Sequence, residues 1–326
     1  MESAAVMERF LSRRELLRSA GRASLGALAL MGLVDASTEA QQPTESPEIH
    51  HIHGLAVDRR NPEVLYIATH TGLVRIRPNA LPEWVGTHRF DLMGFTAHPR
   101  ETSLVYASGH PDLATYRQNE IANLGLLVSR DGGKTWQSVA LKGEADFHAL
   151  TYSPRNGGEL YGWSVAGQIG LHRISATSWR GERLPARGLS NVLSLAASPD
   201  PAGPLFAGTK AGLMTSRDRG MTWTPVTPIP ADAPVSAVSY HASDPGLVYV
   251  YVARSDGRLM RSSDGGATWA PTGFVGDTRT AVVALAAGPG ESVVLATTNS
   301  DVLRSRDGGR TWQRVLERGR PVTGAR

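Results

Sequence analysis

Histidine is distributed unevenly along this chain of 326 residues. Of its ten histidines, eight fall between residues 50 and 148, namely His50, His51, His53, His70, His88, His98, His110 and His148. Imidazole is the commonest metal-binding side chain. Because the chain has no cysteine, a metal centre must use nitrogen, oxygen or thioether sulfur, and a blue-copper site with a cysteine ligand is excluded. The histidines therefore indicate metal binding in the first half of the chain.

An internal repeat indicates the fold that must position these side chains. The pattern Ser-x-Asp-x-Gly-x-Thr-Trp occurs four times, at 129–136, 216–223, 262–269 and 305–312. Each copy is typical of a hairpin turn, because aspartate accepts backbone N–H groups, glycine supplies a positive φ, and tryptophan anchors the outgoing strand. Repetition at intervals of about forty residues is typical of propellers and solenoids. We therefore interpret the four aspartates as structural and expect each tryptophan to be buried beside its own turn.

These octapeptides resemble Asp boxes, also called BNR repeats, which occur in sialidases, sortilin-type receptors and many exported sialidase-like bacterial propellers. In that family the box joins the third and fourth strands of a blade, at the rim and away from the active face. The resemblance implies a β-propeller fold. It implies a function only weakly, because one fold hosts many functions.

Six segments of the sequence align in register with these turns. They begin at His51, Asp91, Asp146, Asn191, Pro234 and Ala281. In each, the fourth residue is small and the fifth is large and apolar, an alternation typical of a strand. The small residue indicates the innermost strand of a blade, packed close to a central axis. Residues 50–326 are therefore predicted to form an all-β, six-bladed β-propeller with four-stranded antiparallel blades and Asp-box turns.

In such a ring, the start of each innermost strand and the end of each second strand approach one mouth of the central channel. In blades one to three these positions supply His51, His53, His70, Asp91, Met93, His110, Asp146 and His148. The matching positions of blades four to six carry no imidazole, carboxylate or thioether. Methionine beside histidine favours copper, whereas histidine with aspartate suits zinc. We therefore expect a copper or zinc site, in which His53, Met93 and His148 converge on one ion.

The same residues also suit two other interpretations. They could form a hydrogen-bonded plug that fills the channel mouth, because buried polar groups pair with one another. They could also bind a small or glycan ligand. Three further histidines are interpreted as structural, because His98 and His241 fall at the opposite face and His172 falls in a third strand.

A glycoside hydrolase of the sialidase-like type is the alternative function that the Asp-box resemblance implies. That family uses three arginines to clamp the substrate carboxylate, with the bidentate geometry of guanidinium. None of the mouth positions is arginine. However, an insertion at 111–125 carries Tyr116 and Glu120, and a tyrosine with a nearby carboxylate is a candidate nucleophile pair. The insertion also suits a plain polar loop with a short helical turn. A third alternative is an assembly scaffold with a protein partner, so the sequence leaves open whether the chain is an enzyme.

The first forty residues have the order of a signal peptide. Basic residues precede an apolar run at 23–34, and Ala36 and Ala40 offer cleavage points before a polar linker at 41–49. The stretch from Ser12 to Leu17, with Arg13 and Arg14, resembles the twin-arginine motif, which implies export of a folded protein. We therefore expect a periplasmic or secreted protein. An apolar run of about twelve residues is too short to cross a membrane. The net charge of +4 is spread along the chain, so nucleic-acid binding is not expected.

Overall fold

The computed structural model describes residues 46–322 except 228, 255 and 277–279. The expected signal peptide over 1–40 and the linker residues 41–45 lie outside the described residues. Residues 46–50 have no secondary structure, yet Pro47 and Ile49 are buried. Ile49 packs with Ile52 and Leu316 in the hydrophobic core. The packed part of the propeller therefore includes residues that precede its first strand.

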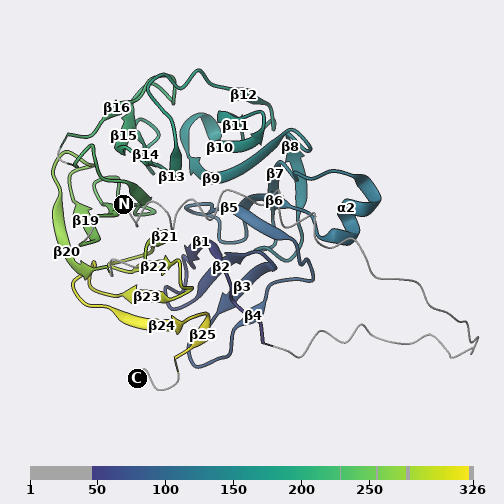
Figure 1. Cartoon of the computed structure of the whole chain (residues 1–326), viewed down its shortest axis with the longest axis horizontal. Coiled ribbons are helices and arrows are strands. Elements are labelled where there is room, and N and C mark those ends of the chain that lie inside the picture. The colour runs from purple at the N-terminus through teal and green to yellow at the C-terminus, as the bar shows by residue number, and fades with distance from the viewer. Residues whose placement is uncertain (1–45, 228, 255, 277–279, 323–326) are drawn as a thin grey trace, which may run out of the picture. The chain divides into compact units, whose positions relative to one another are not determined.

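Six antiparallel sheets surround a centre in the described part of the chain (Figure 1). The first blade contains β1 (Ile52–Val57), β2 (Leu65–Thr69), β3 (Gly72–Ile76) and β4 (Glu83–Trp84). The second contains β5 (Asp91–Ala97), β6 (Val105–His110), β7 (Leu126–Ser129) and β8 (Gln137–Ala140). The third contains β9 (Ala145–Ser153), β10 (Glu159–Gly167), β11 (Gly170–Ser175) and β12 (Gly181–Arg183).

The other three blades repeat this order. The fourth contains β13 (Val192–Ala197), β14 (Leu205–Thr209), β15 (Gly212–Ser216) and β16 (Thr224–Pro225). The fifth contains β17 (Val235–Tyr240), β18 (Val248–Val252), β19 (Arg258–Ser262) and β20 (Ala270–Val275). The sixth contains β21 (Val282–Ala287), β22 (Val293–Thr297), β23 (Val302–Ser305), β24 (Gln313–Glu317) and β25 (Arg320–Pro321). The prediction of a six-bladed propeller is confirmed, with a fifth short strand in the last blade.

The hydrophobic core of the ring lies between blades. Six clusters of buried side chains each join two consecutive blades, including the last and the first. The innermost strands contact one another around a closed cycle, in which β21 meets β1. The predicted crowding of these strands is confirmed: a Cβ added at Gly54 would lie 2.7 Å from Phe95 Cβ, and one at Gly94 would lie 2.6 Å from the Phe147 carbonyl oxygen. Glycine at these positions lets adjacent blades approach closely.

The four Asp boxes make the hydrogen bonds that their chemistry predicts. In the box at 216–223, Asp218 accepts from the backbone N–H of Thr222 at 2.9 Å and from its hydroxyl at 2.5 Å, while Ser216 Oγ accepts from Gly220 N–H at 2.9 Å. The boxes at 129–136, 262–269 and 305–312 repeat these contacts. The Thr222 hydroxyl hydrogen bond, with the other donors of the turn, lowers the pKa of Asp218 to about 2. The carboxylate is therefore held ionised as the centre of the turn.

The expected burial of the tryptophans is wrong for three of the four boxes. Trp223 is 4% exposed, but Trp136, Trp269 and Trp312 are only partly buried. Each ring packs against a core cluster with one side. The indole N–H of Trp223 donates to the Gly220 carbonyl at 3.1 Å within its own box. The box lies at the rim of the blade, so one face of the ring stays near solvent.

The ring closes without exchange of strands, because each described sheet is built from consecutive strands. Contacts between the first and last blades join the ends instead. Glu63 accepts hydrogen bonds from Arg304 Nη1 at 2.7 Å, and from Nε and Nη2 of Arg306 at 2.9 and 2.7 Å. Arg59 Nη1 donates to the Ala287 carbonyl at 3.3 Å. Side-chain packing and this charged contact therefore take the place of a shared blade.

None of the helices in the described part of the chain combines the length and the apolar character that a membrane span needs.

Candidate metal centre

A β-bulge recurs in the innermost strand of every blade. The register of β1 against β2 shifts between Ile52 and Gly54, so that His53 is the extra residue. The same shift leaves out His148 between β9 and β10, and it occurs at the matching place in the other four blades. A bulge bends its strand and re-aims a side chain. The side chains of His53 and His148, at the predicted mouth positions, therefore do not follow the regular two-residue alternation of the sheet.

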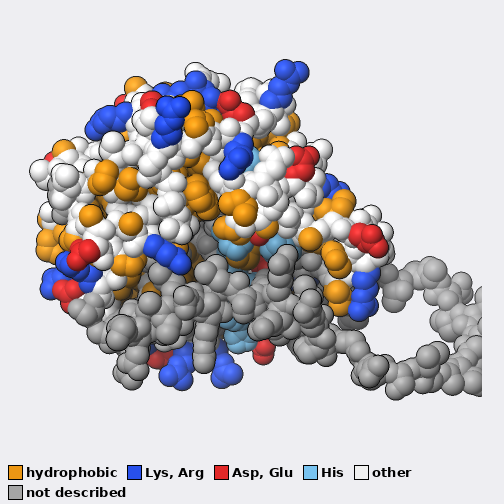
Figure 2. All heavy atoms as spheres, turned by 45° about the horizontal axis from the view of Figure 1, so that its top comes forward, with side chains coloured by type: hydrophobic (Ala, Val, Ile, Leu, Met, Phe, Trp, Pro, Cys, Tyr) orange, Lys and Arg blue, Asp and Glu red, His pale blue; other side chains and the backbone are white. Residues whose placement is uncertain are grey.

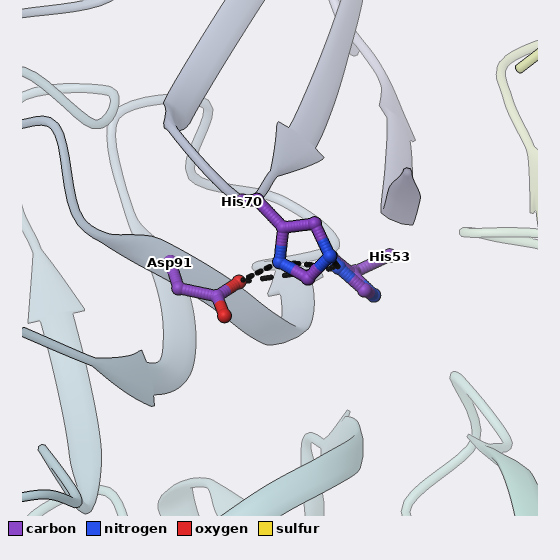
Figure 3. Close-up of side chains that lie close together, drawn as sticks. All are labelled: His53, His70 and Asp91. Carbon is purple, nitrogen blue, oxygen red and sulfur yellow. Dashed lines mark hydrogen bonds and ion pairs between the residues drawn. The ribbon is translucent and has the colours of Figure 1, made fainter. Parts of the chain in front are cut away.

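The first His–Asp cluster consists of His53, His70 and Asp91 (Figure 3). His53 comes from the bulge of β1, His70 follows the end of β2, and Asp91 begins β5 of the next blade. Figure 3 shows the His70 ring between the Asp91 carboxylate and the His53 ring. His70 Nδ1 lies 2.8 Å from Asp91 Oδ1, and His53 Nε2 lies 3.2 Å from both ring nitrogens of His70 and 3.9 Å from Asp91 Oδ1. Three potential ligand atoms thus converge across one blade interface.

The spacing of these atoms suits a transition-metal ion. In a tetrahedral zinc site with bonds of about 2.0–2.1 Å, the ligand atoms lie roughly 3.3 Å apart. Among His70 Nδ1, His53 Nε2 and Asp91 Oδ1, the distances of 2.8, 3.2 and 3.9 Å scatter around that value. The side chains of His53, His70 and Asp91 are 19%, 23% and 11% exposed, so the cluster is shielded yet reachable from solvent. Two imidazoles and a carboxylate are ligands that zinc and copper(II) both accept.

The second His–Asp cluster consists of His110, Asp146 and His148. His110 ends β6, and the other two residues lie near the start of β9 in the next blade. His148 Nε2 lies 2.9 Å from Asp146 Oδ2, and His110 Nε2 lies 3.5 Å from the same oxygen. His53 and His148 therefore belong to different clusters, which differs from the expected convergence on one ion. Figure 2 shows histidine side chains with a carboxylate among them near the centre of one face.

The two remaining predicted residues lie beside these clusters. His51 has a φ of 53°, and its ring centroid is 5.0 Å from that of His70. Met93 is partly buried and lies within the bulge of β5, between Leu92 and Phe95. All eight predicted metal ligands thus come from the inner strands and second-strand ends of the first three blades.

The ring encloses a central cavity of about 160 Å³, lined by the innermost strands of all six blades. His53 and His148 line it together with apolar residues such as Leu193 and Val283. Ser194 of the fourth blade and Ser239 of the fifth line it as well, so the lining mixes polar and apolar residues around the ring.

The structural interpretation of His98, His172 and His241 is consistent with their contacts. His98 Nδ1 accepts the backbone N–H groups of Arg100 and Glu101 at 3.2 and 2.9 Å, and His241 Nδ1 accepts those of the corresponding turn. His172 Nε2 donates to the Gln168 carbonyl at 2.7 Å. Burial lowers the pKa of all three imidazoles. All three imidazoles hydrogen bond to backbone groups in turns and strands.

The candidate catalytic pair lies on an exposed insertion. Helix α2 (Leu113–Asn119) begins after Asp112, whose side chain accepts the Thr115 N–H, and it contains Tyr116, which is 43% exposed. Glu120 ends the helix with a φ of 54°. Figure 1 shows α2 outside the ring, beyond β6 and β7. The insertion thus forms a short surface helix.

Sequence reasoning missed two contacts of the site. Asp91 was assigned to the mouth, but its contact with His70 of the preceding blade was not foreseen. The insertion also contributes, because the Ala122 carbonyl oxygen lies 2.9 Å from His110 Nδ1. The first contact has a sequence signal, since Asp91 and Asp146 both follow a blade with a histidine at the end of its second strand or directly after it.

The family described as BNR/Asp-box repeat matches residues 127–138, which include the first of the four boxes. The boxes join third and fourth strands in a ring of six sheets. The chain is an Asp-box β-propeller. No curated protein matches its sequence. Among solved structures, this propeller is similar to the GH74 xyloglucanase from Xanthomonas campestris, with 16% identity, a TM-score of 0.55, and coverage of 84% of this chain and 46% of that chain.

Two further structures share the propeller fold. A chain of the nidogen/laminin complex is 12% identical with a TM-score of 0.56, covering 77% of this chain and 91% of that chain. A chain of the mitotic checkpoint complex is 14% identical with a TM-score of 0.52, covering 89% of this chain and 88% of that chain. This propeller spans less than half of the xyloglucanase that it matches. Likeness at such identities concerns the fold alone.

Proposed function

We propose that the protein is an exported Asp-box propeller that binds a transition-metal ion, zinc or copper, at the first His–Asp cluster. The observation that carries this proposal is the convergence of His53, His70 and Asp91 from two blades at the spacing of metal ligands. Three protein ligands leave a further coordination position for water or an incoming ligand. A binding or transfer role fits such a centre, and the export part of the proposal rests on the N-terminal sequence pattern.

The donor set supports metal binding over a simple polar contact. The Asp91 carboxylate accepts a hydrogen bond from His70 Nδ1, which in the neutral ring puts the lone pair on Nε2, 3.2 Å from His53 Nε2. A carboxylate that accepts the second ring N–H of a metal-binding histidine is a common device for fixing the tautomer of the ligand. Asp91 is placed to serve either as a ligand or as this orienting group.

Metal analysis and calorimetry test the proposal. The mature chain, purified without an affinity tag, is analysed for bound metal and titrated with Zn(II) and Cu(II). We expect His53→Ala and His70→Ala to weaken binding at this site by about 100-fold or more, because loss of a supporting contact alone costs 10–100-fold. His88→Ala is the matched control, since His88 is an exposed histidine of the same blade. It should bind metal as the wild type does.

Two results would contradict the proposal. If the wild-type protein binds Zn(II) and Cu(II) no more tightly than the His53→Ala/His70→Ala variant, the cluster is a hydrogen-bonded plug. If metal-free protein hydrolyses a fluorogenic sialoside, the glycoside hydrolase alternative is correct instead.

A further inference from the structure

The second His–Asp cluster repeats the construction of the first at the next blade interface. In both, an imidazole at the end of the second strand of one blade, or just after it, lies beside an aspartate at the start of the innermost strand of the following blade, or one residue into it: His70 with Asp91, and His110 with Asp146. The sequence places this combination at only these two interfaces, because the residues equivalent to His70 in the other blades are Val165, Lys210, Ala253 and Thr298. Two equivalent sites therefore stand side by side, joined by the pairing of Asp91 with His110 across β5 and β6.

The tautomer of His110 leaves a lone pair in the second cluster. A carbonyl oxygen only accepts hydrogen bonds, so His110 Nδ1 carries the proton that it shares with Ala122 at 2.9 Å. In the neutral ring, Nε2 is then an acceptor, and it faces Asp146 Oδ2 at 3.5 Å. Two acceptors that face each other repel unless a proton or a cation lies between them. Donation of the other ring N–H to a backbone carbonyl is the usual arrangement of a metal-bound histidine.

Asp146 also has an unused oxygen. Its side chain is 4% exposed, and Oδ2 pairs with His148. Asp146 Oδ1 is buried and accepts no hydrogen bond from any described residue. A buried, unpaired carboxylate oxygen is costly, so such an atom points to a ligand that completes its environment. This observation is independent of the spacing of the three side chains.

By register, the position of the second cluster that matches His53 of the first carries a soft donor. Met93 occupies, in the bulge of β5, the position that His53 occupies in the bulge of β1. The second cluster thus corresponds to the first, moved on by one blade. Met93 takes the place of His53, His110 that of His70, and Asp146 that of Asp91. His148 is an additional imidazole. Thioether sulfur is a ligand that selects copper(I), whereas two imidazoles with a carboxylate suit zinc or copper(II).

We infer that the propeller has a second metal site, formed by His110, Asp146, His148 and Met93, and that this site binds copper(I). The inference rests on the proposed function in one respect only, namely that the adjoining first cluster binds metal as well. The two neighbouring sites would then hold ions of different softness.

The experiment uses the mature chain loaded with one equivalent of Zn(II) and then titrated anaerobically with Cu(I), against the competing chelator bicinchoninate. We expect the wild type to take up one Cu(I) and to retain its zinc. His110→Ala should retain zinc and lose copper(I) binding, whereas His70→Ala should lose zinc and keep copper(I). Met93→Leu should bind copper(I) about 10–100-fold more weakly, as expected for a changed metal environment. Met221→Leu, a change at an exposed methionine of the fourth blade, is the control.

Absorption at the copper K-edge supplies a second readout. We expect a sulfur scatterer at copper in the wild type and its absence in Met93→Leu. The inference is overturned if Cu(I) binds His110→Ala as tightly as the wild type, or if Cu(I) displaces the zinc so that only one ion is bound. An unchanged affinity and spectrum in Met93→Leu overturns the sulfur ligand. Loss of zinc binding in every protein, with copper(I) binding intact in the wild type, would refute the proposed function and leave this inference standing.

Discussion

Glu63 is predicted to hold the ring closed. Arg304 is buried, with 5% of its side chain exposed, and burial lowers the pKa of its guanidinium. Glu63 is the carboxylate that compensates this charge across the junction of the last and first blades. Glu63→Ala leaves Arg304 with the backbone oxygen of residue 63 as its remaining partner there. Removing one member of a buried ion pair costs about 3–5 kcal/mol.

The low end of that range applies here, because Glu63 is 35% exposed and water reaches the site. Arg306 is 52% exposed, so the loss of its own bonds adds only about 0.5 kcal/mol. For a propeller of about 280 residues, about 3 kcal/mol lowers the Tm by roughly 5 °C, because the entropy of unfolding grows with chain length. Differential scanning calorimetry of Glu63→Ala measures this shift. Glu182→Ala is the control, because Glu182 pairs with Arg173 inside a single blade and is 58% exposed.

A double variant distinguishes the cost of an unpaired Arg304 charge from the loss of the contact with Glu63. If the cost comes from an unpaired buried cation, Glu63→Ala/Arg304→Met should melt well above Glu63→Ala, because an apolar side chain of similar length removes the charge. A Tm of Glu63→Ala within about 2 °C of the wild type, where about 5 °C is expected, would refute the assignment of Glu63 to ring closure. So would a double variant that melts no higher than the single one.

Further measurements test the turns, the core and the export signal. The pKa of Asp218 is about 2 in the folded chain, against about 3.9 in an unfolded one, so its contribution to stability is present above pH 4 and is lost as the pH falls toward 2. In urea unfolding at pH values between 4 and 2, the free energy of unfolding should therefore fall less with pH for Asp218→Asn than for the wild type. Trp223→Ala should cost about 3–5 kcal/mol as a buried large aromatic, and the partly buried Trp312 should cost less when changed to alanine; equal costs in urea titrations would contradict this order. Changing Arg13 and Arg14 to lysine should strand the precursor in the cytoplasm, and continued accumulation in the periplasm on fractionation would indicate a general secretory route.

The sequence was sufficient for the fold because each of its signals has a local physical cause. The small residue in each innermost strand, such as Gly54 or Gly94, is required because the neighbouring blade approaches closely there. Each Asp box forms its hydrogen bonds within a stretch of eight residues. Burial of the box tryptophans was overestimated, because exposure at the rim depends on what covers the blade rather than on the box itself.

The candidate site could be predicted only in part. The two-residue alternation and the blade register place His53, His70 and Asp91 at one end of the ring. That these residues form one cluster while His110 and His148 belong to another depends on the angle between adjacent blades and on the bulges. Neither feature can be recognised in the residue pattern. The contact between His110 and Ala122 depends on how the insertion after β6 returns to the sheet. Long-range geometry of this kind has no local signature.

Because of the bulge in every innermost strand, one residue per blade can change without affecting the strand pairing that holds the fold together. The extra residue takes no part in the ladder, so its replacement leaves strand pairing unchanged. The ring tolerates histidine at positions 53 and 148, leucine at 193 and valine at 283 on one repeated backbone. Natural variation can therefore exchange the groups facing the channel one blade at a time, and a propeller of this design is free to acquire, lose or relocate a ligand without passing through an unfolded intermediate.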